Sequence, residues 1–398
     1  MCIRDREGTV AFLQMVGITQ AIARHKEAGL PYLVYLRGPT FGGVLASWGS
    51  LGHVTIAEPG AAIGFLGPRV YQALHGEPFP EGVQTAENLA ARGLLDAVVA
   101  PEDIADVADR ALRVLAARRT WHRDGPVVGP VAGDGTEADD PEDGRAAWEV
   151  VTASRRTDRP GVRRLLRTAA TDVVTLNGTG AGESDPGLLL ALARFGGAPC
   201  VVLGQDRRGQ SLSAPLGPAA LREARRGMRL AAELRLPLVT LIDTPGAALS
   251  AAAEEGGLAG EIARCLSDLV TLAAPTLAVL LGQGTGGGAL ALVPADRVLA
   301  AANGWLGPLP PEGASAIVHR DLEHAPEMAA AQGVRATDLW RAGIVDRVVP
   351  ERPDAADEPD EFCRRLGRVL AEELAGLLGR DDGERRQSRA RRWRHLGR

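Results

Sequence analysis

Two glycine-rich stretches carry the residues of this chain whose types and spacing could do chemistry. The first runs from Thr40 to Ser47, and the second runs from Leu281 to Leu292, reading L-G-Q-G-T-G-G-G-A-L-A-L. Each follows an apolar run of strand length that opens at or just after a proline, Pro31 or Pro275. Glycines let the backbone turn tightly, and consecutive free N–H groups at a helix start hold negative charge well. For one such loop, a strand-to-helix turn without chemistry is an equally good interpretation.

The two stretches belong to a longer internal repeat. Gly64 to Pro68 reads G-F-L-G-P and resembles Gly304 to Pro308, which reads G-W-L-G-P. Further on, Gly93 to Glu102 resembles Gly343 to Glu351. Three matched landmarks in the same order predict an internal duplication, with one glycine loop in each half of the chain.

A dinucleotide site is one interpretation of the second loop. Gly282-x-Gly284-x-x-Gly287 satisfies the dinucleotide-binding pattern after a strand. That pattern expects an acidic residue ~20 positions further on. Asp296 lies too close and Glu312 is the next acid, so this interpretation is disfavoured.

Catalysis by side chains is also weakly supported. Ser47 follows the first loop, but the matching residue of the second copy is apolar, and Glu254-Glu255 is more simply explained as solvated loop charge than as an acid pair. A third interpretation uses both loops, with the pair Gly42-Gly43 matched to Gly287-Gly288 although its spacing from the proline is one residue shorter. Two sets of backbone N–H donors suit a reaction in which two carbonyl-type oxygens gain negative charge.

Composition limits the class of protein. A chain of 398 residues with 45% hydrophobic residues can form about two domains, and its formal charge of −5 argues against a nucleic-acid binder. No apolar run reaches the ~18 residues of a membrane span, and no signal peptide is visible. We therefore expect a cytoplasmic, reduced protein with no membrane or nucleic-acid partner. Neither a disulfide framework nor a metal site is expected, because the four cysteines are scattered without C-x-x-C spacing: Cys2, Cys200, Cys265 and Cys363.

The elements that must position the loops alternate between strands and helices, which predicts an α/β fold with a parallel sheet. A stretch rich in Gly, Pro, Asp and Glu interrupts the alternation and is interpreted as a linker. The expected division is a first domain over 1–123, a linker over 124–147 and a second domain over 148–398. The expected strands include Pro31–Leu36, Val54–Ala57, Ala97–Ala100, Cys200–Leu203, Leu238–Ile242 and Thr276–Leu281. The expected helices include Val10–Ala28, Val44–Leu51, Thr85–Arg92, Ile104–Arg118, Val162–Ala170, Gly187–Phe195, Pro218–Leu234, Glu261–Ala273, Ala331–Gly343 and Asp360–Leu378.

Several motifs carry a family resemblance. The second half resembles the carboxyltransferase alpha subunit of acetyl-CoA carboxylase through Asp243 to Gly246 (D-T-P-G), Gly284 to Ala291 and Pro311 to Ile317. The first half resembles the beta subunit of the same enzyme through Met15, Gly42-Gly43-Val44, Ala46-Ser47, Ile56 to Gly60, Ile63 to Phe65 and Gly67 to Val70. The chain is thus similar to a fused beta–alpha carboxyltransferase.

The resemblance implies two crotonase-like (ClpP/crotonase) domains, a first substrate of the acyl-CoA class with acetyl-CoA favoured, and a second substrate, carboxybiotin on a biotin carboxyl carrier protein. It also implies biotin carboxylase as a partner enzyme, a homo-oligomer and a role in fatty acid biosynthesis. Gly42-Gly43 would hold the acyl-CoA oxygen, and Gly287-Gly288 would hold the biotin oxygen. The substrate-binding residues carried over by the motifs are Gly64, Phe65, Gly67, Thr244, Pro245, Gly246 and Ala289.

Departures from the family leave alternatives open. The zinc ribbon and the first part of the beta-like domain have no counterpart, so we expect a truncated, incomplete first domain and no structural zinc. Gln283 stands where the family usually has an acid, and Ala-Ala-Leu-Ser follows Gly246 in place of the usual aromatic-proline-glycine. A propionyl-CoA or other acyl-CoA carboxyltransferase, a crotonase-fold hydratase with positioned glutamates, or a non-catalytic acyl-CoA-binding subunit are the rival interpretations.

Overall fold

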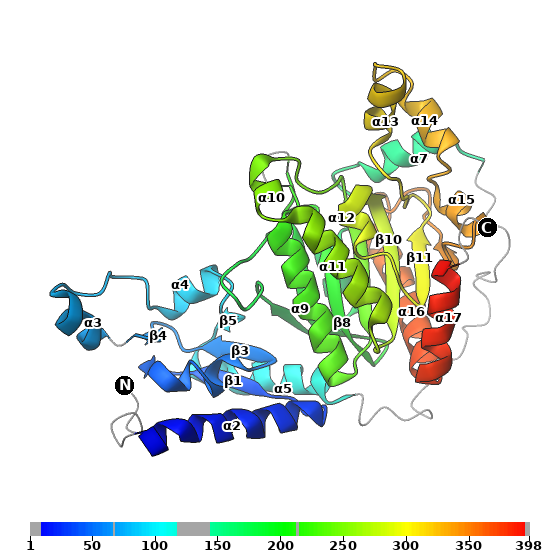
Figure 1. Cartoon of the computed structure of the whole chain (residues 1–398). Helices are drawn as coiled ribbons and strands as arrows, with labels where there is room; N and C mark the ends of the chain where they lie inside the picture. The colour runs from blue at the N-terminus through cyan, green and yellow to red at the C-terminus, as the bar shows by residue number, and fades with distance from the viewer. Residues whose placement is uncertain (1–8, 67, 118–143, 212–214, 395–398) are drawn as a thin grey trace.

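The computed structural model describes residues 9–66, 68–117, 144–211 and 215–394, and a seven-stranded sheet lies at its centre (Figure 1). The strand order is β12-β11-β10-β9-β8-β7-β6. Strands β8 to β12 run parallel, and β6, β7 and β8 form antiparallel pairs. The strands are β6 (Thr171–Leu176), β7 (Leu188–Phe195), β8 (Ala198–Gln205), β9 (Leu238–Thr244), β10 (Thr276–Gly284), β11 (Arg297–Ala301) and β12 (Arg347–Val349).

Helices cover both faces of this sheet. On β7, for example, Leu189 and Ala191 pack in one hydrophobic cluster while Leu190 and Leu192 pack in the other, as the two-residue period of a strand requires. Helices α8 (Val162–Ala169) and α16 (Pro359–Leu378) cover the first face, and α9 (Pro218–Leu234) and α11 (Leu258–Thr271) cover the second. The remaining helices of this half are α7 (Ala147–Ser154), α10 (Ala251–Glu255), α12 (Gly286–Leu290), α13 (Pro311–Val318), α14 (Ala325–Ala331), α15 (Ala336–Arg341) and α17 (Asp382–Arg394).

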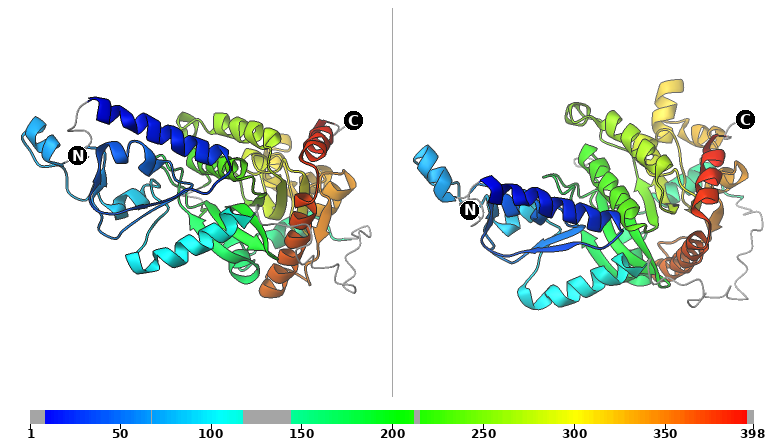
Figure 2. Two further views of the ribbon diagram at one scale, coloured as in Figure 1. Left: turned by 90° about the horizontal axis from the view of Figure 1, so that it is seen from below. Right: turned by 60° about the horizontal axis from the view of Figure 1, so that its bottom comes forward.

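The first half forms a smaller lobe beside the large sheet. Its three-stranded parallel sheet has the order β1-β3-β5, so β1 is an edge strand within the described residues. Seen from below, α2 and α5 run on either side of this small sheet (Figure 2). The elements are α2 (Thr9–Glu27), β1 (Leu33–Leu36), β2 (Thr40–Phe41), the 3₁₀ turns η1 (Gly42–Val44) and η2 (Trp48–Ser50), β3 (Val54–Ala57), β4 (Ile63–Gly64), α3 (Pro68–His75), α4 (Ala86–Ala91), β5 (Ala97–Val98), η3 (Pro101–Asp103) and α5 (Ile104–Leu115).

The two halves share one hydrophobic core and a network of buried polar contacts. Val54 and Ile56 of β3 and Val114 of α5 belong to the same cluster as the inner face of β7 and helix α9. Arg226 of α9, whose side chain is 13% exposed, donates to both carboxylate oxygens of the buried Asp96 at 2.8 and 3.0 Å. The first-half lobe is therefore fixed to the large sheet by packing as well as by this ion pair.

The internal duplication is visible in the strand register. Leu33 of β1 pairs with Val54 of β3, and Leu277 of β10 pairs with Arg297 of β11. Asp96 accepts the N–H of Thr55, and at the corresponding place Asp346 accepts the N–H of Val298.

In this register Gly42 is the structural counterpart of Gly286. Both glycines have a positive φ, +69° and +64° respectively. The structure thus matches Gly42-Gly43 to Gly286-Gly287, at equal distance from Pro31 and Pro275, and not to Gly287-Gly288.

Two expected helices are wrong. Gly187–Phe195 was expected to be helical, but Leu188–Phe195 is strand β7. The run L-L-L-A-L-A-R-F is apolar on both faces, so its period could not separate a strand from a buried helix, and the hairpin to β8 decides for the strand. Val44–Leu51 forms only the short turns η1 and η2, because the carbonyls of Val44 and Trp48 close tight turns with Ser47 and Leu51.

Most other expected elements are confirmed in kind, with ends shifted by a few residues. The expected helix Ala331–Gly343 is the shorter α15, and the expected linker falls mostly on residues outside the described part of the chain. In the ranges that the structure describes, no helix is long and apolar enough to cross a membrane.

Candidate active site

The second glycine loop lies where two neighbouring parallel strands end. Thr244, the last residue of β9, is paired with Gly284, the last residue of β10. The turn that follows β9, from Pro245 to Ala247, therefore lies beside the loop that follows β10. In parallel α/β sheets, ligands bind outside the carboxyl ends of the strands. The structure thus brings together the predicted residues of the second half: Thr244, Pro245, Gly246, Gly287, Gly288 and Ala289.

Two amides of this loop have no acceptor among the residues that the structure describes. The N–H of Gly286 donates to the carbonyl of Gly307 at 2.9 Å, and the N–H of Ala289 donates to the carbonyl of Thr285 at 3.4 Å. Between them, the amides of Gly287 and Gly288 make no hydrogen bond with any residue that the structure describes. They are the orphan donors of the first turn of α12 and can hold an oxygen that becomes negatively charged.

Close packing requires glycine at several positions of the loop. A Cβ on Gly288 would lie 3.3 Å from both the N and the Cβ of Ala247, and one on Gly282 would lie 2.5 Å from Oδ1 of Asp243. A Cβ on Gly287 would meet Ile262 at 2.7 Å. The loop therefore lies directly against the turn after β9 and against α11.

Asp243 is a fully buried carboxylate beneath the loop. Desolvation raises its pKa, while Arg207, 3.4 Å from Oδ2, opposes that rise. Its Oδ1 accepts the backbone N–H of Gln283 at 3.1 Å. The position at which the family usually has an acid thus contributes a main-chain contact here, and the buried charge comes from the neighbouring strand.

The first glycine loop has a similar arrangement. The N–H of Gly42 donates to the carbonyl of Phe65 at 3.0 Å, and β2 pairs with β4 through Phe41 and Gly64. The amide of Gly42 is therefore occupied, whereas that of Gly43 has no acceptor among the described residues. In the structure the carbonyl of Phe65 is the counterpart of the carbonyl of Gly307, whereas the repeated sequence pattern aligns Phe65 with Trp305. Gly67 lies outside the described residues.

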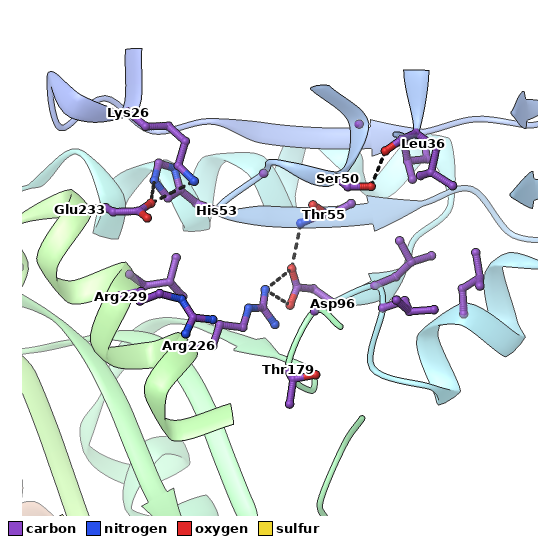
Figure 3. A pocket seen from close by; sticks show the side chains of 18 of the residues that line it. Lys26, Leu36, Ser50, His53, Thr55, Asp96, Thr179, Arg226, Arg229 and Glu233 are labelled. Atoms are coloured by element: carbon purple, nitrogen blue, oxygen red, sulfur yellow. Dashed lines mark hydrogen bonds and ion pairs between the residues drawn. The ribbon is translucent and has the colours of Figure 1, made fainter. Parts of the chain in front are cut away.

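A cavity of about 420 Å³ adjoins the first loop (Figure 3). Gly64 and Phe65, two of the predicted substrate-binding residues, line it together with Leu36 and Leu45. Phe65 is 69% exposed, so its ring is available to a ligand. The volume is within the range of roughly 300–1,000 Å³ usual for small-molecule sites.

The opposite wall of the cavity carries charged groups from both halves. Glu233 of α9 contacts Nζ of Lys26 at 3.0 Å and Nε2 of His53 at 3.1 Å (Figure 3). The hydrogen bond from His53, aided by Lys26, lowers the pKa of Glu233 to about 2. His53 accepts the N–H of Tyr32 at Nδ1, which leaves Nε2 to donate to Glu233. These groups fix α2 and the residue just before β3 to α9.

The side chains considered for acid–base or nucleophilic chemistry bond to the nearby backbone, are exposed to solvent or are buried. The hydroxyl of Ser47 donates to the carbonyl of Gly43, and Glu254 and Glu255 are exposed at the end of α10. The described cysteines are buried, and burial raises the pKa of Cys265 and Cys363 to about 12. In the parts of the chain that the structure describes, no group of three or more His, Cys, Asp or Glu side chains could hold a metal.

Gln205 and Gln210 are parts of the site that the sequence did not reveal. Gln205 is the last residue of β8, and Gln210 follows the strand. Gln205 contacts Gly288 and Asp243, and Gln210 contacts Thr244, so both lie at the ends of β9 and β10. No motif or period marks them, because their partners are remote in the sequence.

Comparison with known proteins identifies the family. The model of the acetyl co-enzyme A carboxylase carboxyltransferase-like family matches residues 144–397. A probable biotin-dependent acyl-coenzyme A carboxylase beta3 subunit of Mycobacterium tuberculosis is 61% identical over 99% of this chain and 77% of its own length. The chain belongs to this carboxyltransferase family. It is a biotin-dependent acyl-CoA carboxyltransferase. Acetyl-coenzyme A carboxylase carboxyl transferase subunits beta/alpha of Salinispora tropica is 38% identical over 99% of the chain and 71% of its own length.

Solved structures confirm the fold. Transcarboxylase 12S, described as a hexamer assembly with methylmalonyl-coenzyme A bound, matches 92% of this chain and 68% of its own chain with a TM-score of 0.68 at 21% identity. A single-chain, multi-domain long-chain acyl-CoA carboxylase matches 87% of this chain and 33% of its own, with a TM-score of 0.64 at 22% identity. The crotonase-like α/β fold inferred from the sequence motifs is therefore confirmed.

Proposed function

We propose that this family member transfers a carboxyl group from carboxybiotin to acetyl-CoA, which gives malonyl-CoA for fatty acid biosynthesis. Relatives named as acetyl-coenzyme A carboxylase subunits support acetyl-CoA as the acceptor, while the more similar mycobacterial subunit is named only for acyl-coenzyme A. The observation that carries the proposal is the presence of two glycine loops, each at the end of corresponding strands and each with an amide that has no acceptor among the described residues.

The loops suit a reaction in which charge develops on two oxygens. Carboxybiotin, held on a separate biotin carboxyl carrier protein and charged by biotin carboxylase, supplies the carboxyl group and a nitrogen that accepts the α-proton of the acyl group. The amides of Gly287 and Gly288 are placed to stabilise the ureido oxygen, and Thr244, Pro245, Gly246 and Ala289 would shape that pocket. Each such donor is worth about 10²–10³ in rate.

The first loop would stabilise the thioester oxygen of acyl-CoA. The pair inferred from the sequence was Gly42-Gly43. Because the Gly42 amide is occupied, we propose Gly43 and the next residue, Val44, as the donors. Gly64, Phe65 and Gly67 belong to the acyl-CoA side in this proposal. The adjoining cavity supports it, since an apolar wall beside the loop can receive the pantetheine or acyl part of the substrate.

A decarboxylation assay with free biotin tests the function. The full chain is mixed with malonyl-CoA, propionyl-CoA-derived methylmalonyl-CoA or longer carboxylated acyl-CoA, and biotin-dependent release of CO₂ is measured. Biotin-dependent turnover that is fastest with malonyl-CoA supports the proposal. Faster turnover of a larger substrate overturns acetyl-CoA as the acceptor, and binding of acyl-CoA without turnover favours a non-catalytic subunit.

Assembly and location are part of the same proposal. We propose a homo-oligomer, because transcarboxylase 12S is described as a hexamer and because β1 presents an unpaired strand edge within the described residues. Light scattering after size exclusion tests this, and a fully active monomer would overturn it. A cytoplasmic location is proposed from the sequence and is tested by cell fractionation.

A further inference from the structure

Gln205 lies at the end of β8, with its side chain buried between the two loops of the second-half site. Its Nε2 donates to the carbonyl of Gly288 at 2.8 Å, and its Oε1 accepts the N–H of Asp243 at 3.1 Å. No part of the residue is accessible to solvent. Both ends of one carboxamide are therefore used, one on the glycine loop and one on the strand that leads to the turn Thr244–Gly246.

The glycine loop needs such an external contact. Gly286, Gly287 and Gly288 open α12, which has only five residues, and glycine loses more conformational freedom on ordering than any other residue. The hydrogen bond that closes the first turn, from the N–H of Ala289 to the carbonyl of Thr285, is long at 3.4 Å, although the N–H of Ala291 donates to the carbonyl of Gly287 at 3.0 Å. By contrast β8 is buried along its whole length and is paired on both sides.

We infer that Gln205 is a positioning residue that holds the amides of Gly287 and Gly288 in the geometry that stabilises the oxyanion. The contact to the Gly288 carbonyl fixes the plane of the peptide that follows Gly288 and hence the backbone angles of Gly288 itself. The same side chain fixes Asp243, so the loop and the neighbouring turn keep one relative position. Gln205 does not touch substrate; it acts through the loop. This inference rests on the proposed function.

Thr240 provides a matched control. It is also buried, lies on the adjacent strand β9, and donates its hydroxyl to the carbonyl of Leu292 at 2.8 Å. Thr240→Val therefore removes a buried side-chain-to-backbone hydrogen bond close to α12, but not one to the residues with free amides. Gln205→Leu removes both contacts of Gln205, and so does Gln205→Met, which keeps more of the side-chain length.

Two readouts test the inference on the full chain. The first is steady-state malonyl-CoA decarboxylation with free biotin. Gln205→Leu is expected to lower kcat about 10- to 100-fold, less than the outright loss of an oxyanion donor, with little change in KM for the acyl-CoA. The second is hydrogen exchange of the peptide that spans Gly286 to Leu292, which is expected to become faster. Gln205→Met should show the same losses, and it replaces the leucine variant if that variant does not fold.

Thr240→Val is expected to lower the melting temperature but to keep kcat and the exchange rate of the glycine loop. The inference is overturned if the Gln205 variants keep kcat within about twofold of wild type, or if Thr240→Val loses kcat equally. An inactive wild-type enzyme would instead refute the proposed function. In that case hydrogen exchange still tests the positioning role, and unchanged exchange in the Gln205 variants overturns it.

Discussion

Replacing Gly288 by alanine is the sharpest test of the second glycine loop. Gly288 is buried, and the new Cβ would lie 3.3 Å from the N and Cβ of Ala247 and 3.4 Å from Cδ2 of Leu216. These contacts are closer than ordinary van der Waals packing, so α12 and the turn after β9 must move apart by a few tenths of an ångström. Gly288 does not have a positive φ, so the backbone itself accepts alanine without strain.

The stability effect is expected to be small and the activity effect large. Alanine gains about 1 kcal/mol over glycine in a helix, whereas overpacking costs about 1–3 kcal/mol. The net destabilisation is thus about 0–2 kcal/mol, which lowers the melting temperature by no more than roughly 8 °C. A misplacement of 1 Å at a reacting centre can cost about 10²-fold, so the smaller shift expected for alanine should lower kcat about 10-fold. Valine should cost about 100-fold.

Activity and stability must be measured together for this prediction. The assays are biotin-dependent decarboxylation of malonyl-CoA and calorimetric unfolding of the same preparations. Gly376→Ala is the control, because Gly376 lies in α16 and a Cβ there would have no atom within 4 Å. This variant should be as stable as wild type or more so, with unchanged kcat. A folded Gly288→Ala enzyme with wild-type turnover would refute the oxyanion assignment.

Three further predictions concern charged side chains. Burial raises the pKa of Glu223 in the folded protein to about 7 from 4.5, so wild type becomes less stable as the pH rises through that interval. The free energy of unfolding of Glu223→Gln, relative to wild type, should therefore be about 1–3 kcal/mol higher at pH 8 than at pH 5. An equal effect at both pH values in urea unfolding would contradict this. The hydrogen bond from His53 lowers the pKa of Glu233 to about 2. The ionised carboxylate therefore contributes its full stabilisation of the fold above pH 4.5, and this contribution is lost as the pH falls towards 2. Because its side chain is 39% exposed, Glu233→Gln should cost only about 1–2 kcal/mol at pH 7, and a cost that persists undiminished at pH 2.5 would be evidence against the ion pair. Arg226→Met leaves the buried Asp96 without its cation and should cost about 3–5 kcal/mol in denaturant unfolding, whereas a loss under 1 kcal/mol would show that the ion pair does not hold the halves together.

The sequence by itself determined the parts of this protein that depend on local pattern. Apolar runs bounded by Pro and Gly marked β3, β9 and β10 as strands, and the sequence also predicted α9 and α16 as helices with nearly correct ends. The repeated landmarks revealed the duplication, since two copies of one backbone plan keep glycine at the same tight turns. The motifs around Thr244 and Gly288 were sufficient to indicate the carboxyltransferase family, which the comparisons confirmed.

The tertiary structure decided what depends on partners remote in the sequence. Leu188–Phe195 is a strand because β8 pairs with it, and its uniformly apolar sequence carries no period that could have shown this. The amide of Gly42 is not free, because it donates to the carbonyl of Phe65, and sequence spacing does not predict that contact. Gln205 is buried between Gly288 and Asp243 for the same reason: hydrogen bonds between strand ends are set by sheet order and register, and neither is local to the chain.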